Sequence, residues 1–170
     1  MLATENTRQD LQVALVGAGA ETDIVGASLS AGGCKLDQQL RVDHHAARCS
    51  SQQTLRNLVA GKGTTTCNGR IYIGKQAGGT SAHLSCRNLS LGANSTVNAK
   101  PELEIYTDDV QCSHGATIGE LDPDHLFYLR SRGVSAAQAR ALLTQAFVNE
   151  CFTGSFADEN RSAFSSALDG

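Results

Sequence analysis

The sequence predicts a mainly β body of about one hundred residues followed by a small α-helical segment. Between residues 11 and 118, short β-prone runs alternate with glycine-containing breaks. The chain has 17 glycines among 170 residues and only 5% aromatic residues, a composition that suits many short strands and tight corners. After Leu121 the pattern changes to helix-capping residues and an apolar stripe with helical spacing.

Alternation along the first part of the chain predicts individual strands. Leu11, Val13 and Leu15 recur at every second position, which is the period of a strand. Glycine pairs at residues 17 and 19 and at 32 and 33 are expected to break the strands. Asn68-Gly69 is predicted to form a turn between two β-prone runs, residues 64–67 and 70–73.

Three β architectures fit this pattern: a sandwich, a barrel or a solenoid. Four cysteines, at positions 34, 49, 67 and 86, are spaced by 15 to 19 residues. In a solenoid with coils of roughly 20 residues they would stack as a ladder. This spacing favours the solenoid, while the simplest role for the cysteines themselves is that of small buried apolar residues.

Two helices are predicted after the β body. Asp122 can cap a helix that begins at Pro123, and Gly133 can terminate it. Ser135 and Gln138 have the spacing of a capping box that opens a second helix. The apolar stripe of this second helix comprises Ala139, Leu142, Leu143, Ala146 and Phe147.

Composition excludes several classes of function. A net charge of −3, with both signs scattered, gives no footprint for nucleic acid or an anionic membrane. The apolar runs are too short to span a bilayer, and the polar first ten residues are not a secretory signal. The six cysteines are therefore expected to be reduced thiols, and no CxxC pair indicates a zinc ribbon. Residues 61–64, GKGT, lack the remaining positions of a phosphate-binding loop, so this chain is not expected to bind a nucleotide.

Two groups of residues could bind metal. His44 and His45 are adjacent and would point to opposite faces of a strand, which disfavours a shared metal. Cys112 and His114 would instead share one face of a strand, about 7 Å apart at the backbone, and both can ligate iron or zinc. The same parity is also that of a buried stripe with one hydrogen-bonded histidine, so spacing alone leaves both interpretations open.

The stretch from Lys100 to Gly119, KPELEIYTDDVQCSHGATIG, resembles the signature of the SufD proteins, members of the SufB/SufD family of the SUF iron–sulfur cluster assembly machine. Similarity continues through LFYLRSRGV at residues 126–134 and the following helix to Phe147, and more weakly back to residue 42. It covers roughly residues 11 to 150. SufB proteins carry C-E-H-E-A where this chain has CSHGA at residues 112–116, which favours SufD.

The resemblance implies a right-handed parallel β-helix followed by a small helical domain. The β-helix core is expected at residues 1–119, a helical segment that docks the ATPase SufC at 120–153, and a polar tail at 154–170. Partner contacts are expected at Leu126, Phe127, Tyr128, Arg130 and Arg132.

The resemblance also implies a function. The chain would be a scaffold rather than an enzyme. It would pair with SufB and bind SufC, and a transient iron–sulfur cluster would form at the interface with SufB. His114 is the first candidate ligand for iron or the cluster, and Cys112 the second. Closure of the two SufC subunits would shift this interface, so that residues buried at rest can act once it opens.

SufD proteins are longer and carry an N-terminal helical domain and further coils. The chain is therefore expected to be a C-terminal portion whose first strand presents an open edge. The expected compartment is the cytoplasm or a plastid-type organelle.

Two other classes of function are consistent with the pattern. One is a structural β-solenoid module that binds a protein partner and has no role with metal. The other is a polysaccharide-cleaving β-helix enzyme, which the absence of a carboxylate-rich groove motif and of a secretion signal disfavours.

Overall fold

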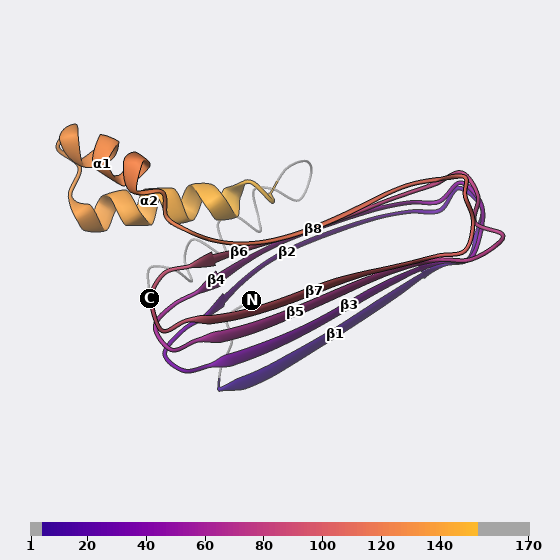
Figure 1. The fold of residues 1–170 in the computed structure, drawn as a ribbon, viewed down its shortest axis with the longest axis horizontal. Coiled ribbons are helices and arrows are strands. Elements are labelled where there is room, and N and C mark those ends of the chain that lie inside the picture. Colours follow the sequence, from indigo (N-terminus) through magenta and orange to yellow (C-terminus); the bar gives the residue numbers. More distant parts are fainter. Residues whose placement is uncertain (1–4, 153–170) are drawn as a thin grey trace.

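The computed structural model describes residues 5–152 and confirms a mainly β protein with two C-terminal helices (Figure 1). The polar tail predicted at residues 154–170 lies outside the described part of the chain. The strands are β1 (Asn6–Leu15), β2 (Glu21–Ser30), β3 (Lys35–His44), β4 (Ser50–Val59), β5 (Thr64–Ile73), β6 (Thr80–Ser90), β7 (Thr96–Ile105) and β8 (Val110–Glu120). The helices are α1 (Pro123–Ser131) and α2 (Ala136–Asn149).

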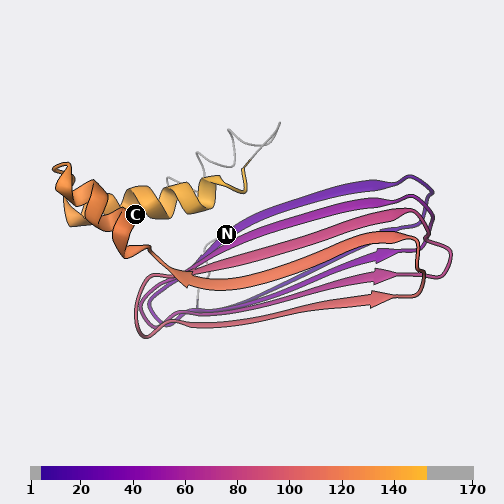
Figure 2. The same cartoon turned by 45° about the horizontal axis from the view of Figure 1, so that its top comes forward.

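The strands form a parallel β-solenoid. Odd-numbered strands make one sheet in the order β1-β3-β5-β7, and even-numbered strands make the other in the order β2-β4-β6-β8. All pairings are parallel, and each coil contributes one strand to each sheet. Figure 2 shows the two sheets as facing layers whose strands run along the long axis of the molecule.

The coils are longer than the cysteine spacing suggested. Asn6 lies opposite Lys35, and Lys35 lies opposite Thr64, so a coil takes 29 residues in this region. The expected ladder of four cysteines is therefore wrong. Cys34 and Cys49 precede β3 and β4 in two separate turns, whereas Cys67 and Cys86 lie within strands of opposite sheets.

The core lies between the sheets and is built from alternate residues of each strand. Buried aliphatic side chains from neighbouring coils stack on one another, for example Val42 of β3 on Ile71 of β5. Val13 packs against this core and Leu15 is buried, which confirms the strand predicted there. Among the described residues, Gly19, Gly32 and Gly33 have positive φ and lie in turns as predicted, because a left-handed backbone strains residues with a Cβ.

The turn predicted at Asn68-Gly69 is wrong, because both residues lie in the middle of β5. Gly69 faces the core, and a Cβ built on it would lie 2.4 Å from the Leu84 side chain. Asn68 points outward and donates to the amide oxygen of Gln39 on β3, at 3.3 Å. The glycine thus permits close packing inside a strand, a role that looks the same in sequence as a turn glycine.

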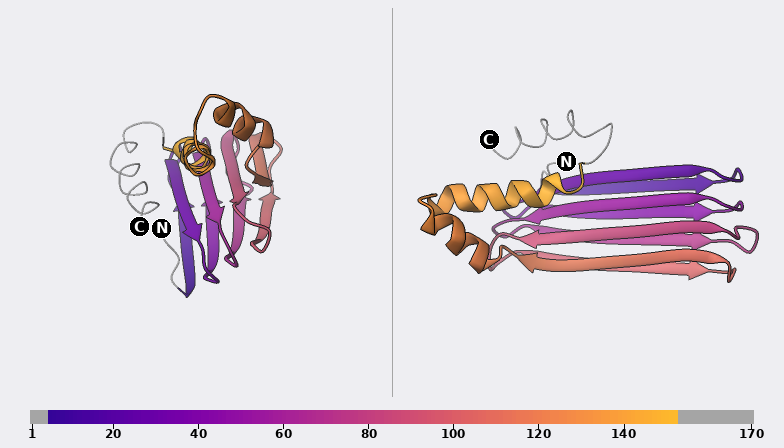
Figure 3. Two further views of the ribbon diagram at one scale, coloured as in Figure 1. Left: turned by 90° about the vertical axis from the view of Figure 1, so that its left-hand side faces the viewer. Right: turned by 90° about the horizontal axis from the view of Figure 1, so that it is seen from above.

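Both helices begin as predicted, α1 ends before Gly133 as predicted, and α2 packs on the outer face of the even-numbered sheet. Asp122 caps α1 through the backbone of Asp124, and Ser135 and Gln138 form a capping box on α2. Leu58 and Leu89, from β4 and β6, are buried beneath Val148, Cys151 and Phe152. Figure 3 shows α1 leaving the end of β8 and α2 returning across the strands toward the first coils. Neither α1 nor α2 is long and apolar enough to cross a membrane.

Candidate functional site

Strands β7 and β8 form the last coil of the solenoid among residues 5–152. No further coil in this range stacks on them. Each of these two strands is paired on one edge only, β7 with β5 and β8 with β6. Pro101 lies in β7, where the missing N–H is tolerated because edge strands need not pair on both sides. We call the core-directed side chains of this coil the open end: Val97, Ala99, Pro101, Leu103, Ile105, Val110, Cys112, His114, Ala116 and Ile118.

The register places Cys112 and His114 on the same, core-directed side of β8. Cys112 lies next to Ala82 of β6, and His114 next to Leu84. Both neighbours are buried, so the two predicted ligands point along the interior face of the sheet. No coil among the described residues covers this face, and His114 is exposed while Cys112 is half-buried. The shared face predicted from spacing is therefore present, but as an uncovered surface rather than as a buried stripe.

The chemistry of this pair is that of two potential metal ligands. Burial raises the pKa of the Cys112 thiol, although a hydrogen bond with the backbone of Ala82 partly opposes this shift. The protonated thiol must lose its proton before it can bind metal. Within residues 5–152, no three His, Cys, Asp or Glu side chains are grouped to hold a metal ion. Cys112 and His114 can supply two ligands, and further ligands must come from another chain, sulfide or solvent.

The outer face of β8 is fixed to the preceding coil. Ser113 lies 2.8 Å from Nδ1 of His83, whose Nε2 lies 3.1 Å from the Ser81 hydroxyl. The Ser113–His83 contact adds a side-chain link to the backbone pairing of β8 with β6, and this pairing sets the positions of Cys112 and His114 on the opposite side.

The adjacent histidines take separate structural roles. His44 is fully buried, with Nδ1 3.0 Å from the Tyr72 carbonyl and Nε2 2.9 Å from the Ser51 hydroxyl. His45 is exposed, and its ring packs against Tyr72. The arrangement agrees with the interpretation that the two do not share a metal.

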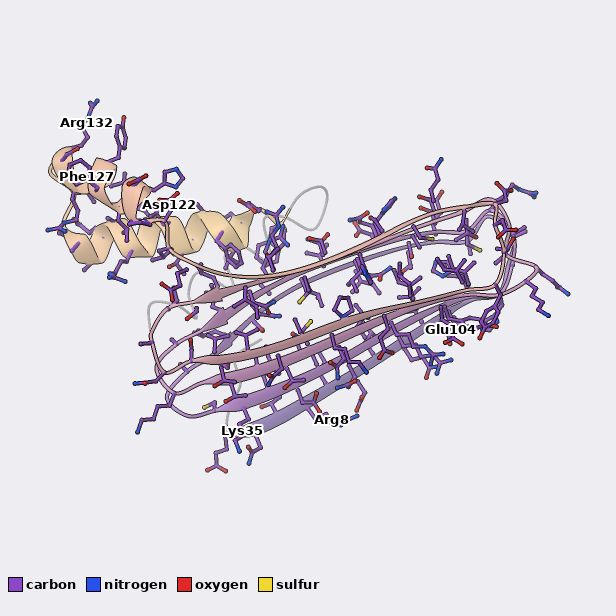
Figure 4. The ribbon with its side chains drawn as sticks, viewed as in Figure 1. Arg8, Lys35, Glu104, Asp122, Phe127 and Arg132 are labelled. Carbon is purple, nitrogen blue, oxygen red and sulfur yellow. The ribbon has the colours of Figure 1, made fainter. Side chains whose placement is uncertain are left out.

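Helix α1 and its C-terminal cap, Arg132, carry the residues expected to contact a partner, and no side chain of α1 is buried. Phe127 is 74% exposed and Tyr128 57% exposed, whereas Leu126 is half-buried. The Arg132 guanidinium lies over the Tyr128 ring at 5.2 Å. Phe127 and Arg130 line a shallow hollow of about 500 Å³ at the α1–α2 turn. Figure 4 shows Phe127 and Arg132 at the end of the helical segment away from the strands.

Sequence reasoning missed how α2 is fixed to the sheet. Glu150, which caps α2, pairs with Arg87 of β6 at 3.1 Å and with Arg56 of β4 at 3.7 Å. Arg56 is almost fully buried, and its guanidinium lies over the Phe147 ring at 5.9 Å. The sequence carries no local signal for this arrangement, because Arg56 stands among alternating apolar and polar residues and its partner lies almost one hundred positions away.

Comparisons with known proteins identify the family of this chain. Residues 1–147 match the family described as SUF system FeS cluster assembly, SufBD core domain. The chain is 40% identical to Iron-sulfur cluster assembly protein SufD of Escherichia coli K12 over 114 residues, which is 67% of this chain and 27% of that protein. It is 38% identical over 116 residues to Protein ABCI7, chloroplastic, of Arabidopsis thaliana, covering 68% of this chain and 24% of that protein. A SufBD family protein of Synechocystis matches 88% of this chain at 33% identity, and 33% of its own length is covered. The chain thus spans about a quarter to a third of these relatives.

Proposed function

Because the chain belongs to the SufBD family of iron–sulfur cluster assembly proteins, we propose that it is a non-catalytic scaffold subunit of the SUF complex. It pairs with SufB, binds the SufC ATPase, and contributes to iron acquisition and assembly of the nascent cluster at the SufB interface. Iron and sulfide are the cargo of this assembly, and ATP is bound by SufC. The compartment stays a prediction, the cytoplasm or a plastid-type organelle; one relative carries the name chloroplastic.

The open end is the observation that carries this proposal. It combines two potential iron ligands, Cys112 and His114, with two strands whose outer edges are unpaired in the described residues. Unpaired edges can hydrogen-bond a strand of another chain. A partner docked there would cover exposed apolar side chains such as Ile118, which is 58% exposed. It would also enclose Cys112 and His114 and add the ligands that this chain lacks.

The helical segment is the proposed SufC-docking site. Exposed aromatic and arginine side chains are the residue types that most often dominate binding energy at interfaces. Phe127, Tyr128 and Arg130 are exposed on α1, and Arg132 is exposed at its C-terminal cap. Leu126, the remaining residue proposed for this contact, is half-buried.

The contacts of α2 provide a route from SufC to the cluster site. Glu150 connects the end of α2 to β4 and β6, and β6 pairs along its whole length with β8. A displacement of the helices would therefore pull on β6, the strand that pairs with Cys112 and His114 of β8. Packed elements with two discrete arrangements transmit such shifts better than a flexible linker would.

Co-purification tests the proposal. We would co-express the tagged chain with SufB and SufC from one organism and measure which proteins it retains. Recovery of both supports the scaffold function. Failure to retain either partner, with the chain folded by circular dichroism, would contradict it.

Iron and sulfide loading of the purified complex tests the ligands. We expect His114→Ala to reduce loading strongly and Cys112→Ser to reduce it less. His45→Ala is the matched control, because His45 is also exposed but lies in a turn away from β8. Loading that is equal in all three variants would favour the second candidate, a β-solenoid interaction module without a metal role. One observation favours that candidate, namely that the described residues contain no group of three or more potential ligands.

A further inference from the structure

Cys67 and Cys86 form a buried pair of thiols that the proposed scaffold function does not use. Cys67 lies on β5 and Cys86 on β6, so they face each other from opposite sheets. Their sulfur atoms are 2.7 Å apart, and each residue is 2% exposed. All six cysteines are free in the structure. A disulfide bond is about 2.05 Å long, so a small displacement would bring the two sulfurs within bonding distance.

The polar groups around this pair distinguish the two sulfurs. The side-chain amides of Asn57 and Asn88 each lie 3.6 Å from the Cys86 sulfur and can donate to it. The two amides are themselves fixed, since Asn57 donates to Asn88 at 2.9 Å and accepts from Ser28 at 2.7 Å. All three of these polar residues are buried. Amide donors stabilise a thiolate, so Cys86 is the sulfur prepared to carry negative charge.

The acidities follow from the same contacts. The hydrogen bond with Cys67 lowers the pKa of Cys86, and Asn88 adds to this effect. That hydrogen bond, together with burial, raises the pKa of Cys67, and a hydrogen bond with Asn57 only partly opposes the shift. Cys86 is therefore the better nucleophile of the pair, and Cys67 retains its proton.

The pair lies one strand below the open end. Ala116 of β8 is next to Cys86 in register, and Ala99 of β7 is next to Cys67. Both covering residues are small, and Ala116 and its neighbour Gly115 are exposed. A small reagent needs to pass only one layer of small side chains to reach the sulfurs, whereas a bulky one would be excluded.

We propose that Cys67 and Cys86 are a modification site, at which a peroxide forms a reversible disulfide between the two sheets. The Cys86 thiolate attacks one oxygen of the peroxide, the O–O bond breaks, and a sulfenic acid forms on Cys86 as hydroxide or alkoxide leaves. The Cys67 sulfur then attacks the Cys86 sulfur, the S–O bond breaks, and the Cys67 proton leaves with the departing oxygen as water. Two thiols are oxidised and one peroxide is reduced. A thiol reductant reverses the reaction.

Peptide mapping of the full chain tests the proposal. We would treat the reduced protein with one equivalent of hydrogen peroxide, block the remaining thiols, and digest it without reductant. The expected result is a peptide pair linked through Cys67 and Cys86, a fall of two in the free-thiol count, and recovery of both thiols with dithiothreitol. Free Cys67 and Cys86 in a sample where the more accessible Cys34 is oxidised would overturn the proposal. This measurement needs no variant.

Variants separate the roles of the two sulfurs. In Cys67→Ser, unfolding the peroxide-treated chain in the presence of dimedone should capture a sulfenic acid on Cys86, whereas in Cys86→Ser treated in the same way, Cys67 should stay unmodified. Cys49→Ser is the matched control, because Cys49 is equally buried but contacts only backbone carbonyls in a turn. It should form the linked peptide as the unmodified chain does. Equal dimedone capture in the two single variants would overturn the assignment of Cys86 as the attacking sulfur.

Discussion

Arg87 and Glu150 form an ion pair of 3.1 Å that connects the outer face of the solenoid to the end of α2. Glu150 also lies 3.7 Å from the buried Arg56, so one carboxylate is shared by the positive charges of two arginines. Burial is the largest influence on Arg56 and lowers its pKa, followed by the nearby charge of Arg87. Glu150 therefore adds a polar contact to the apolar packing of α2 on Leu58 and Leu89.

Replacing Glu150 by Gln should loosen α2 from the sheet. The carboxylate is about half exposed, so solvent screening limits the expected loss of stability to about 1 kcal/mol. Urea unfolding would measure this loss. Hydrogen exchange in α2 should be faster in the variant than in the unmodified chain, while exchange in β4 should change little. Glu120→Gln is the control, because Glu120 is exposed at the end of β8. Equal stability of the two variants would show that the Arg56–Glu150–Arg87 contact does not hold the helix.

His44 should make the stability of the protein depend on pH. Burial lowers the pKa of His44, partly offset by its hydrogen bond to the Tyr72 carbonyl. Below a pH of about 6.5, where a histidine in the unfolded chain becomes protonated, the unfolded state binds more protons than the folded state. Stability must therefore fall as the pH drops from 7 toward 5, with a slope of at most about 1.4 kcal/mol per pH unit from this group.

Urea unfolding at several pH values would measure this slope. His44→Gln should lower stability at pH 7, because it disturbs the contacts with Tyr72 and Ser51, but it should remove most of the slope contributed by this group. His125→Gln, at an exposed position of α1, is the control for a histidine substitution outside the core. A slope that His44→Gln does not alter would assign the pH dependence to other groups.

Gly69 should tolerate alanine poorly, although Gly115 should tolerate it well. A methyl group on Gly69 would meet the buried Leu84 side chain, whose displacement should cost about 1–3 kcal/mol. Gly115 has open space around the position of a Cβ, and its backbone is ordinary strand. Thermal unfolding of Gly69→Ala and Gly115→Ala compares the two directly. Similar melting temperatures would mean that the core relaxes freely around Leu84.

Gly69 shows what a local sequence pattern could and could not predict. Caps at Asp122 and Ser135, breaks at Gly19 and Gly32, and the common face of Cys112 and His114 are set by neighbouring residues, and they were predicted correctly. Whether Gly69 makes a turn or a close contact depends on Leu84, fifteen positions away and on the other sheet.

Coil length and helix docking depend on contacts even more distant in the sequence. The cysteine spacing predicted a coil length of roughly 20 residues, whereas the backbone register shows a coil length of 29 residues in the first coils. Cys67 and Cys86 do meet, but across the core rather than along one sheet. The Arg56–Glu150 contact has no local signature for either residue. Pairing across a solenoid is decided by register and turn length together, and neither is visible in a short window.

The two proposed interfaces should be separable by single substitutions. Ile118 belongs to the apolar part of the open end and is 58% exposed in the structure. Ile118→Lys places a charge at this position. Burying an unpaired charge in an interface costs several kcal/mol, so recovery of SufB with the tagged chain should fall at least about tenfold. SufC should be retained, since α1 is unchanged.

Phe127→Ala should give the opposite result. Phe127 is 74% exposed on α1, and loss of a large aromatic anchor commonly costs about 2 kcal/mol or more. SufC binding, measured by calorimetry or by retention on the tagged chain, should weaken at least about tenfold, while SufB recovery stays at the level of the unmodified chain. Loss of both partners in either variant, with the fold intact by circular dichroism, would mean that SufB and SufC do not bind the two ends independently. The proposed division between the open end and the helical segment would then be wrong.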